Sequence, residues 1–327
     1  MARRVNAVLI GLVCAVSVPA TSFAQRSDPP SVPARDVPGP RTPAAPSPPT
    51  QADEVELIQM VRVVGEPGNV DELLDALETA DKGIESFQGQ LMYDRQFLLQ
   101  GDRHVRYGNL YFRVQTGPTG AKLARVKRTF SITFDTLYID DEMREDRSVW
   151  AFDGEWLIEK RPAEKQFVKR RISTPDDPID PLGLGESPIP FPIGQRKRSI
   201  LERYEASMPA PGEGLAVDDE EDDEVKEEAR ALLEAAGECH QLRLVPREAY
   251  AREDQFKEIR LWYARETFLP TMARAINRQG DVSVIRLLNV KVNQELPRHA
   301  INTDPPTEPG WDVQIDEGRV RDGGASR

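Results

Sequence analysis

The pattern of apolar and polar residues changes period near residue 87. From Asn69 to Gly83, apolar residues recur at i, i+3, i+4 and i+7, with Asn69 as N-cap, Glu72 three residues later and Gly83 after the end. This pattern predicts an amphipathic helix. From Phe87 the apolar residues alternate with polar ones, as in a half-buried strand. We therefore expect a helix that packs its apolar stripe on a sheet.

Further alternating segments predict a meander of strands. Residues 104–115 and 129–135 alternate in the same way. Asp153-Gly154 lies between two aromatic runs and predicts a two-residue hairpin, because both central positions of such a turn need φ above zero. A second turn at residues 162–165 reverses the chain again. The centre of the chain is therefore predicted to be an antiparallel meander.

The second half begins with an unusual segment. Pro175–Gly194 holds six prolines and many aliphatic residues, so it is expected to lie over an apolar surface without joining a helix or an inner strand. A helix over 195–208 and an acidic insert over 212–236, itself ending in a helix, follow. Strands are then predicted at Cys239–Pro246, Glu258–Ala264, Pro270–Asn277 and Val282–Val292. In the last of these, Val282, Val284, Leu288, Val290 and Val292 are expected on one face.

This order of elements indicates an α+β protein with one large curved antiparallel sheet. Such a sheet, with one apolar face and few helices, leaves apolar area exposed unless it curls around its own helices or around a ligand. The domain is expected to span residues 53–316 and to be followed by a disordered tail at 317–327.

The N-terminus has the pattern of a secretory signal. Arg3 and Arg4 precede the apolar run Val8–Val18, and a small-x-small cleavage site ends at Ala24. The apolar run is shorter than the roughly 20 residues that a membrane-spanning helix needs. Residues 1–24 are therefore predicted to be a signal peptide. The proline-rich residues 25–52 are predicted to form a disordered tether.

Composition excludes several function classes. The net charge of the chain is −12, and loss of the signal peptide with its two arginines lowers it to −14, so binding of nucleic acid is not expected. Cys239 is then the single cysteine and has no partner for an internal disulfide. The three histidines His104, His240 and His299 are in no metal-ligand spacing. Neither a metal nor another cofactor is expected.

Two residue pairs resemble catalytic groups but are expected to be structural. Asp153 and Glu155 belong to a hairpin turn, where aspartate is typical for backbone reasons. Cys239 and His240 are adjacent, and neighbouring residues of a strand point to opposite faces. No catalytic residue is predicted, although a lipid hydrolase whose nucleophile and base are brought together by the fold stays open as an alternative.

Four segments together resemble the LolA/LolB-like lipoprotein-carrier superfamily. They are the capped helix with ESFQGQ after it, GNLYFR at 108–113, the aromatic-D-G-x-x-L element at 152–157 and PPTEPGWDV at 305–313. The resemblance covers roughly residues 69–316. It implies an unclosed antiparallel half-barrel that helices cover, a periplasmic location, and an apolar cavity that takes the acyl chains of a lipoprotein. The proline-rich crossing is compatible with a lid over such a barrel.

The chain departs from the family at one functional position. The family's second strand commonly ends in Lys-Arg-Pro, and its arginine governs ligand uptake and release. Here Arg113 stands at the lysine position, Val114 at the arginine position and Gln115 at the proline position.

We therefore expect a monomeric periplasmic carrier that binds lipid acyl chains of lipoproteins and transfers them towards the outer membrane. Its expected partners are those acyl chains and an inner-membrane release complex or an outer-membrane acceptor. A lipid-sensing regulator of the same fold is the alternative, and aromatic residues that merely fill a closed core are the structural alternative. The predicted cavity is lined by Phe87, Leu91, Tyr93, Phe97, Leu110, Phe112, Phe130, Ile132, Phe134, Trp150 and Trp156. The predicted lid side chains are Leu182, Leu184, Ile189, Phe191 and Ile193.

Overall fold

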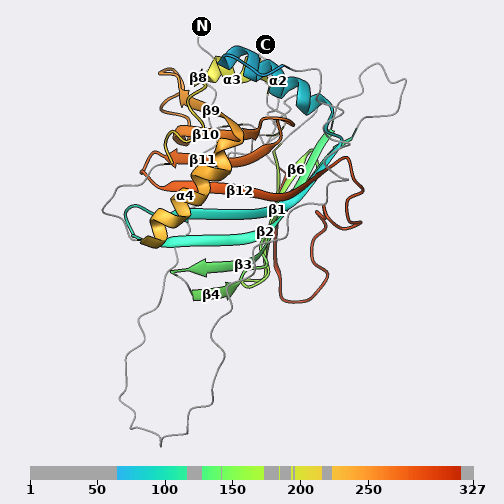
Figure 1. Ribbon diagram of the computed structural model, residues 1–327. Coiled ribbons are helices and arrows are strands. Elements are labelled where there is room, and N and C mark those ends of the chain that lie inside the picture. Colours follow the sequence, from blue (N-terminus) through green and yellow to red (C-terminus); the bar gives the residue numbers. More distant parts are fainter. Residues whose placement is uncertain are drawn as a thin grey trace, which may run out of the picture. The chain divides into compact units, whose positions relative to one another are not determined.

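One large mixed sheet dominates the chain (Figure 1). The computed structural model describes residues 65–115, 127–140, 142–172, 184, 193, 196–215 and 223–317, all within the unit Pro49–Arg327. The predicted signal peptide, tether, C-terminal tail from residue 318 and most of the proline-rich crossing lie outside these residues.

The elements are α2 (Val70–Lys82), β1 (Ser86–Gln96), β2 (Arg103–Gln115), β3 (Lys127–Ile139), β4 (Glu142–Glu145), β5 (Val149–Phe152), β6 (Trp156–Arg161), β7 (Gln166–Arg171), α3 (Lys197–Arg203), β8 (Tyr204–Ser207), α4 (Asp223–Gly237), β9 (Cys239–Pro246), β10 (Phe256–Ala264), β11 (Pro270–Asn277), β12 (Val282–Val292) and β13 (Asp312–Asp316).

The sheet is unclosed and almost entirely antiparallel. Its order is β13-β7-β6-β5-β3-β2-β1-β12-β11-β10-β9-β8, and β4 pairs with β3 beside this path. The one parallel pair in the described sheet joins β13 to β7. The expected α+β class with an unclosed curved sheet is confirmed, with the parallel edge strand as an addition. Among the described helices, none is both long and apolar enough to cross a membrane.

Helix α2 begins and ends where the sequence predicts. The Asn69 side chain accepts the Glu72 N–H at 3.0 Å, and the Glu72 carboxylate accepts the Gly68 N–H at 2.8 Å. These bonds satisfy backbone donors that the first turn leaves free. The apolar stripe Leu73, Leu74 and Leu77 is buried. Helix α3 packs beside α2, and Lys197 Nζ lies 2.8 Å from carboxylate oxygens of both Asp71 and Asp75.

The helix predicted over 195–208 is shorter than expected. It ends at Arg203, and Tyr204–Ser207 forms the edge strand β8 beside β9. Tyr204 is almost fully buried, and its hydroxyl donates to Asp254 at 2.7 Å. Pairing with a strand about 40 positions later therefore overrides the local helical pattern.

The sheet has two faces with different covers. We call the side on which α2 and α3 pack the inner face, and the side that α4 crosses the outer face (Figure 1). On the outer face Ala236 of α4 packs with Cys239, Trp262 and Met272 of three neighbouring strands. Arg103 of β2 ties α4 to the sheet, because its guanidinium lies 2.6 Å from Asp94 and 2.9 Å from Glu228.

A β-bulge moves the residues of β12 from one face to the other. The expected single apolar face of β12 is wrong. Val284 packs with the outer cluster, whereas Val290 and Val292 pack against the inner one. Between them the register with β1 shifts, and Asn289 has φ of +52°. One extra residue reverses the alternation, and the sequence pattern has no residue that requires it.

The central hairpin is centred one residue later than predicted. Its central residues are Gly154 and Glu155, and of the two predicted turn residues only Gly154 has positive φ, at +97°. The Asp153 carboxylate accepts the N–H groups of Glu155 and Trp156 at 3.0 and 2.9 Å. This capping role explains the aspartate and makes a catalytic role unnecessary. The second turn is as predicted, with Arg161 paired to Gln166.

The start of the acidic insert is packed. Glu213 O accepts Gln241 Nε2 and Arg260 Nη1, both at 2.9 Å, and Leu215 is buried beneath α4. Residues 212–215 therefore belong to the outer-face packing. Residues 216–222 lie outside the described part of the chain.

Candidate functional site

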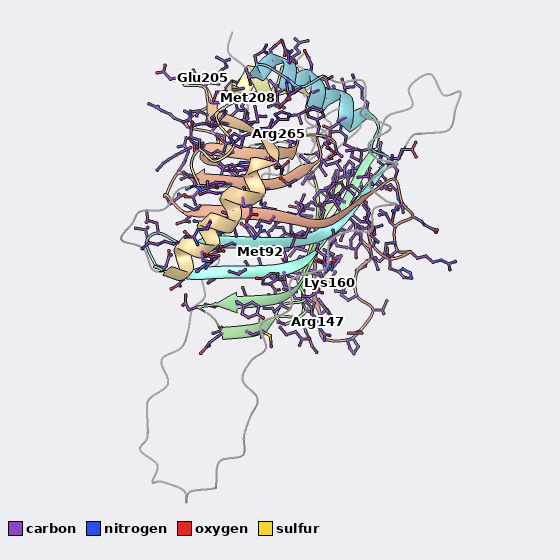
Figure 2. All side chains as sticks on the ribbon, in the orientation of Figure 1. Met92, Arg147, Lys160, Glu205, Met208 and Arg265 are labelled. Atoms are coloured by element: carbon purple, nitrogen blue, oxygen red, sulfur yellow. The ribbon has the colours of Figure 1, made fainter. Side chains whose placement is uncertain are left out.

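The inner face carries the largest apolar cluster of the described residues. Phe112 and Leu110 of β2, Phe130 and Ile132 of β3 and Leu91 of β1 are each at most 5% exposed. The cluster continues through β12, β11, β10 and β9 and is covered by the stripe of α2 and by Ile200 of α3. Figure 2 shows side chains filling the space between α2 and the strands beneath it. The inner face is thus apolar across most of the sheet.

Aromatic rings form a row on this face. Phe134 stacks with Tyr93 at a centroid distance of 6.2 Å and meets Trp150 edge-on at 5.8 Å. Phe130 lies 6.0 Å from Phe152 on the neighbouring strand. Cross-strand aromatic pairs of this kind stabilise a sheet beyond the area they bury. Phe134, Phe152 and Phe130 are at most 5% exposed, so this row is packed within the inner cluster.

The structure brings nine of the eleven predicted cavity residues together. Phe97 lies beyond the end of β1, half-exposed, with the Arg95 guanidinium 4.3 Å from its ring centroid and His104 at 4.8 Å. Trp156 lies on the outer face, packed with Ile158, Phe167 and Ala151. Asp153 N–H donates to Trp156 O, so the hairpin sets Trp156 on the opposite face from Trp150. The residues that lie in the inner cluster are Phe87, Leu91, Tyr93, Leu110, Phe112, Phe130, Ile132, Phe134 and Trp150.

Two side chains of the proline-rich crossing reach the inner cluster. Leu184 and Ile193 are 5% and 1% exposed and pack in it. The other predicted lid residues, Leu182, Ile189 and Phe191, lie outside the described residues. The crossing thus covers apolar surface at these two positions.

Charged residues mark the end of the inner face near the β1–β2 turn. Arg106 Nε lies 2.9 Å from Asp146, and its guanidinium is 6.0 Å from the centroid of Phe134. Arg95 lies 3.4 Å from Asp281. Burial and the neighbouring Arg106 lower the pKa of His104. At this end the face changes from apolar to polar and reaches solvent.

The family's uptake-and-release position has no basic side chain on the inner face. Val114 packs against the inner cluster, and its N–H donates to Glu85 O at 2.8 Å. Arg113 is exposed and is adjacent in the strand, so its side chain lies on the outer face. The two residues that replace the family's Lys-Arg therefore do not place a cation in the apolar cluster.

Cys239 and His240 are separated by the sheet. The Cys239 thiol lies beneath α4, 3.4 Å from Thr271 Oγ1, and burial raises its pKa. His240 lies on the inner face, stacked on Phe268 at 5.6 Å, and burial lowers its pKa. A buried neutral thiol and an imidazole on opposite faces do not form a nucleophile–base pair.

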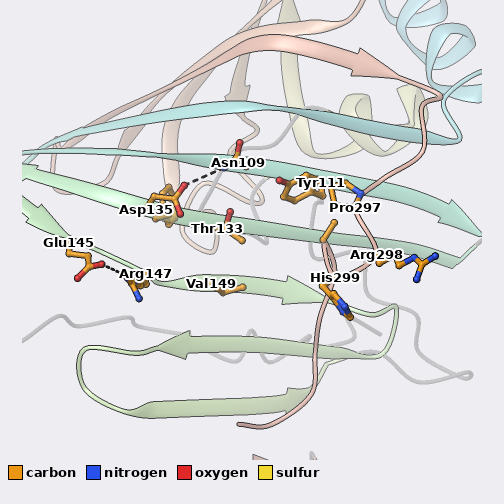
Figure 3. A pocket seen from close by; sticks show the side chains of 12 residues that line it. Asn109, Tyr111, Thr133, Asp135, Glu145, Arg147, Val149, Pro297, Arg298 and His299 are labelled. Atoms are coloured by element: carbon orange, nitrogen blue, oxygen red, sulfur yellow. Dashed lines mark hydrogen bonds and ion pairs between the residues drawn. The ribbon is translucent and has the colours of Figure 1, made fainter. Parts of the chain in front are cut away.

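An open cleft of about 750 Å³ lies on the outer face, where the sequence predicted none (Figure 3). Its floor is formed by β2, β3 and β5, and its wall by part of the strap, which we define as residues 293–311 between β12 and β13. Asn109 donates to Asp135 at 3.3 Å, and Arg147 pairs with Glu145. The cleft carries both signs of charge and is unsuited to an acyl chain. Alternating polar residues on β2 and β3 were a signal for a solvated face, but nothing in the sequence indicates that the strap crosses it.

Comparisons with known proteins identify similar structures. No family model and no curated protein matches the chain. Solved structures similar to it include an uncharacterised conserved protein from Thermus thermophilus, with 10% identity, a TM-score of 0.38, and coverage of 76% of this chain and 98% of that one. A LolA superfamily protein from Nitrosomonas europaea has 12% identity and a TM-score of 0.29, and the alignment covers 72% of this chain and 98% of that one. The superfamily that the sequence resembles is thus represented among these structures.

MucB of Pseudomonas aeruginosa, solved as a complex with MucA, is also similar. The identity is 12%, the TM-score is 0.34 and the alignment covers 72% of this chain. The chain spans 61% of the length of that MucB chain. These likenesses concern the fold alone.

Proposed function

We propose that this protein is a periplasmic carrier that binds lipid acyl chains on the inner face of its sheet. The observation that carries the proposal is the apolar cluster on that face, which runs from β9 to β5 and includes side chains from the proline-rich crossing. A carrier needs a cover that can be exchanged for its ligand.

In this proposal the acyl chain takes the place of Leu184 and Ile193. Both side chains lie in the cluster, so their departure exposes apolar surface that an acyl chain can cover again. Each methylene moved from water contributes about 0.8 kcal/mol, so a chain of roughly 16 carbons offers on the order of 10 kcal/mol before ordering costs. That is sufficient for binding without a polar contact to the chain.

The charged end of the inner face suits the head group of such a ligand. Arg95 and Arg106 are each partly exposed. Arg106 lies beside Phe134 of the row, and Arg95 lies over the ring of Phe97 beyond it. An amphiphile that lies along the face would bury its acyl part against Phe134 and leave its polar part near these arginines and in water. The protein would then act without catalysis and hand its ligand to an outer-membrane acceptor.

The test is native mass spectrometry of the protein taken from its own periplasm, combined with lipid extraction. We expect co-purified lipid that is not turned over on incubation. Phe134→Ala should reduce the amount of retained lipid, because Phe134 lies in the aromatic row. Tyr138→Ala, on the same strand but paired with Tyr107 away from the inner cluster, should retain it. Lipid-free protein, or equal lipid in both variants, would count against the carrier.

A second candidate is a lipid-responsive regulator of a protein partner. It is favoured by an exposed strand at one edge of the sheet, β13, which a carrier alone does not require. Lipid release that depends on a membrane protein partner would support this candidate over a carrier that exchanges lipid without one.

A further inference from the structure

β13 has a free edge in the described sheet. It is the last strand in the order and pairs with β7 alone. All five of its residues are exposed, and the aliphatic side chains of Val313 and Ile315 are 41% and 56% exposed. An edge strand with exposed aliphatic side chains is a template for pairing with another chain.

The backbone of β13 directs two residues towards this free edge. Asp312 N–H donates to Lys165 O of the β6–β7 turn at 2.8 Å. Because successive residues of a strand direct their N–H and C=O groups to alternate sides, Gln314 and Asp316 also face β7. Val313 and Ile315 therefore present their N–H and C=O groups to the free edge.

The side chains of β13 define what an added strand needs. Val313 pairs with Phe167 and Ile315 with Lys169, so both aliphatic side chains lie on the outer face. Asp312 and Gln314 lie on the other face, where the Asp312 carboxylate accepts Gln314 Nε2 at 3.0 Å. Cross-strand partners stabilise a sheet when apolar meets apolar and opposite charges meet. An added strand therefore needs aliphatic side chains on one face and basic side chains on the other.

A second copy of this chain does not meet that requirement. Antiparallel pairing of two β13 strands about Gln314 sets Asp312 opposite Asp316 of the other copy. Parallel pairing in register sets each aspartate beside its equivalent. Like charges directly opposite each other destabilise a strand pair.

We propose that β13 binds an extended segment of a partner protein by β-strand addition, and that this segment alternates basic with aliphatic residues. The site does not depend on lipid binding, because β13 lies at the sheet edge and contributes no residue to the inner cluster. The lipid content of the protein and its binding of such a segment are therefore separate measurements.

The test uses the mature protein and three labelled peptides in a fluorescence-polarisation titration. The first peptide alternates Lys and Val, the second alternates Glu and Val, and the third has the Lys and Val residues in two blocks. We expect the first to bind at least roughly fivefold more tightly than the other two, since only it matches both charge and alternation. Hydrogen exchange should show the amides of Val313 and Ile315 open without the peptide and protected with it.

Ile315→Pro tests the backbone bonds at the free edge of β13 separately from the pairing of β13 with β7. Its ring removes an N–H that faces the free edge and leaves the bonds to β7 intact, as proline does when it is found on edge strands. We expect the alternating Lys peptide to bind at least about fivefold more weakly, because backbone bonds of a ladder are lost. Leu99→Ser, which removes another exposed aliphatic side chain in the β1–β2 turn, is the matched control and should leave binding unchanged.

Three results would overturn the proposal. The first is no binding of the alternating Lys peptide. The second is equal binding by Ile315→Pro and the unchanged protein, which would indicate attraction to the acidic surface only. The third is a concentration-dependent dimer that Ile315→Pro abolishes, which would assign the edge to a second copy of this chain.

Discussion

At the scale of single residues, His240 connects the core to pH. It is 4% exposed, its Nε2 has no hydrogen-bond partner among the residues that the structure describes, and its ring stacks on Phe268. Burial and, less strongly, Arg265 disfavour the charged imidazolium, so the folded-state pKa lies below the ordinary value of 6.5. The unfolded chain therefore binds more protons than the folded one as pH falls through that value.

We expect the free energy of unfolding to decrease as the pH is lowered from about 7.5 to about 5.5, since the neutral ring is the form that the fold stabilises. His240→Phe should keep the stacking on Phe268 and make the melting temperature less dependent on pH in this window. His104→Gln is the matched control. His104 also has a lowered pKa but is half-exposed, so its replacement should change the slope less. An unchanged slope in His240→Phe would contradict the assignment.

At the scale of elements, the start of the acidic insert is packed. Replacing the five acidic residues 218–222 with serine, which keeps the length of the connection, should leave lipid binding and the melting temperature almost unchanged, because clustered like charges repel one another and add little to stability. A deletion that begins at Glu213 should lower the free energy of unfolding by roughly 2–4 kcal/mol, since it takes acceptors from two buried polar side chains. Those side chains are Gln241 and Arg260, 0% and 7% exposed. Thermal unfolding of the two variants checks the difference, and equal loss in both would show that the acidic run packs as well.

Elements with strong local signals were predictable from the sequence. Helix α2 has the predicted N-cap, the predicted role of Glu72 in its first turn, where the Glu72 carboxylate accepts the Gly68 N–H, and the predicted buried apolar stripe. The strands β9, β11 and β12 have the predicted bounds. The unpredicted features depend on distant pairing. β8 forms because Tyr204 pairs with Pro246, and β13 is exposed along its whole length and so has no apolar period. The bulge at Asn289 likewise follows from packing against β1.

The inner-face site was predictable where its residues lie within a strand, and not where they depend on a strand end or on the register of a hairpin. Alternation in β1 to β3 was sufficient to place Phe87, Leu110 and Ile132 on one face. It was insufficient for Phe97, which follows the last residue of β1, and for Trp156, whose face depends on the hairpin register. The outer-face cleft depends on where the strap crosses, and a loop's path over a sheet leaves no periodic signal in the sequence.

At the scale of the whole molecule, ligand entry should depend on the crossing. We expect Leu184→Ala combined with Ile193→Ala to slow lipid loss several-fold, because the smaller side chains compete less well with a bound acyl chain for their places in the inner cluster. As a control, Ile259→Ala removes a fully buried side chain of β10 and should cost about 2–5 kcal/mol of stability. Lipid dissociation and thermal unfolding would be measured for both variants.

Two outcomes would contradict the crossing as a cover. One is unchanged lipid loss in the double variant. The other is hydrogen exchange at Leu184 and Ile193 as slow as at Ile132, which would make the crossing part of the permanently packed core.

The pairing of β1 with β12 has a consequence for how the chain is made. Phe87 lies opposite Val292, so an early strand and a late strand of the domain complete each other. During synthesis the N-terminal part of the chain appears first. One edge of β1 therefore stays unpaired until β12, near the end of the domain, has been made. Contacts so distant in sequence form slowly, and an open edge invites aggregation in the meantime. Biogenesis therefore favours delivery of the whole chain before folding begins, and truncation ahead of Val282 would leave a template for misassembly.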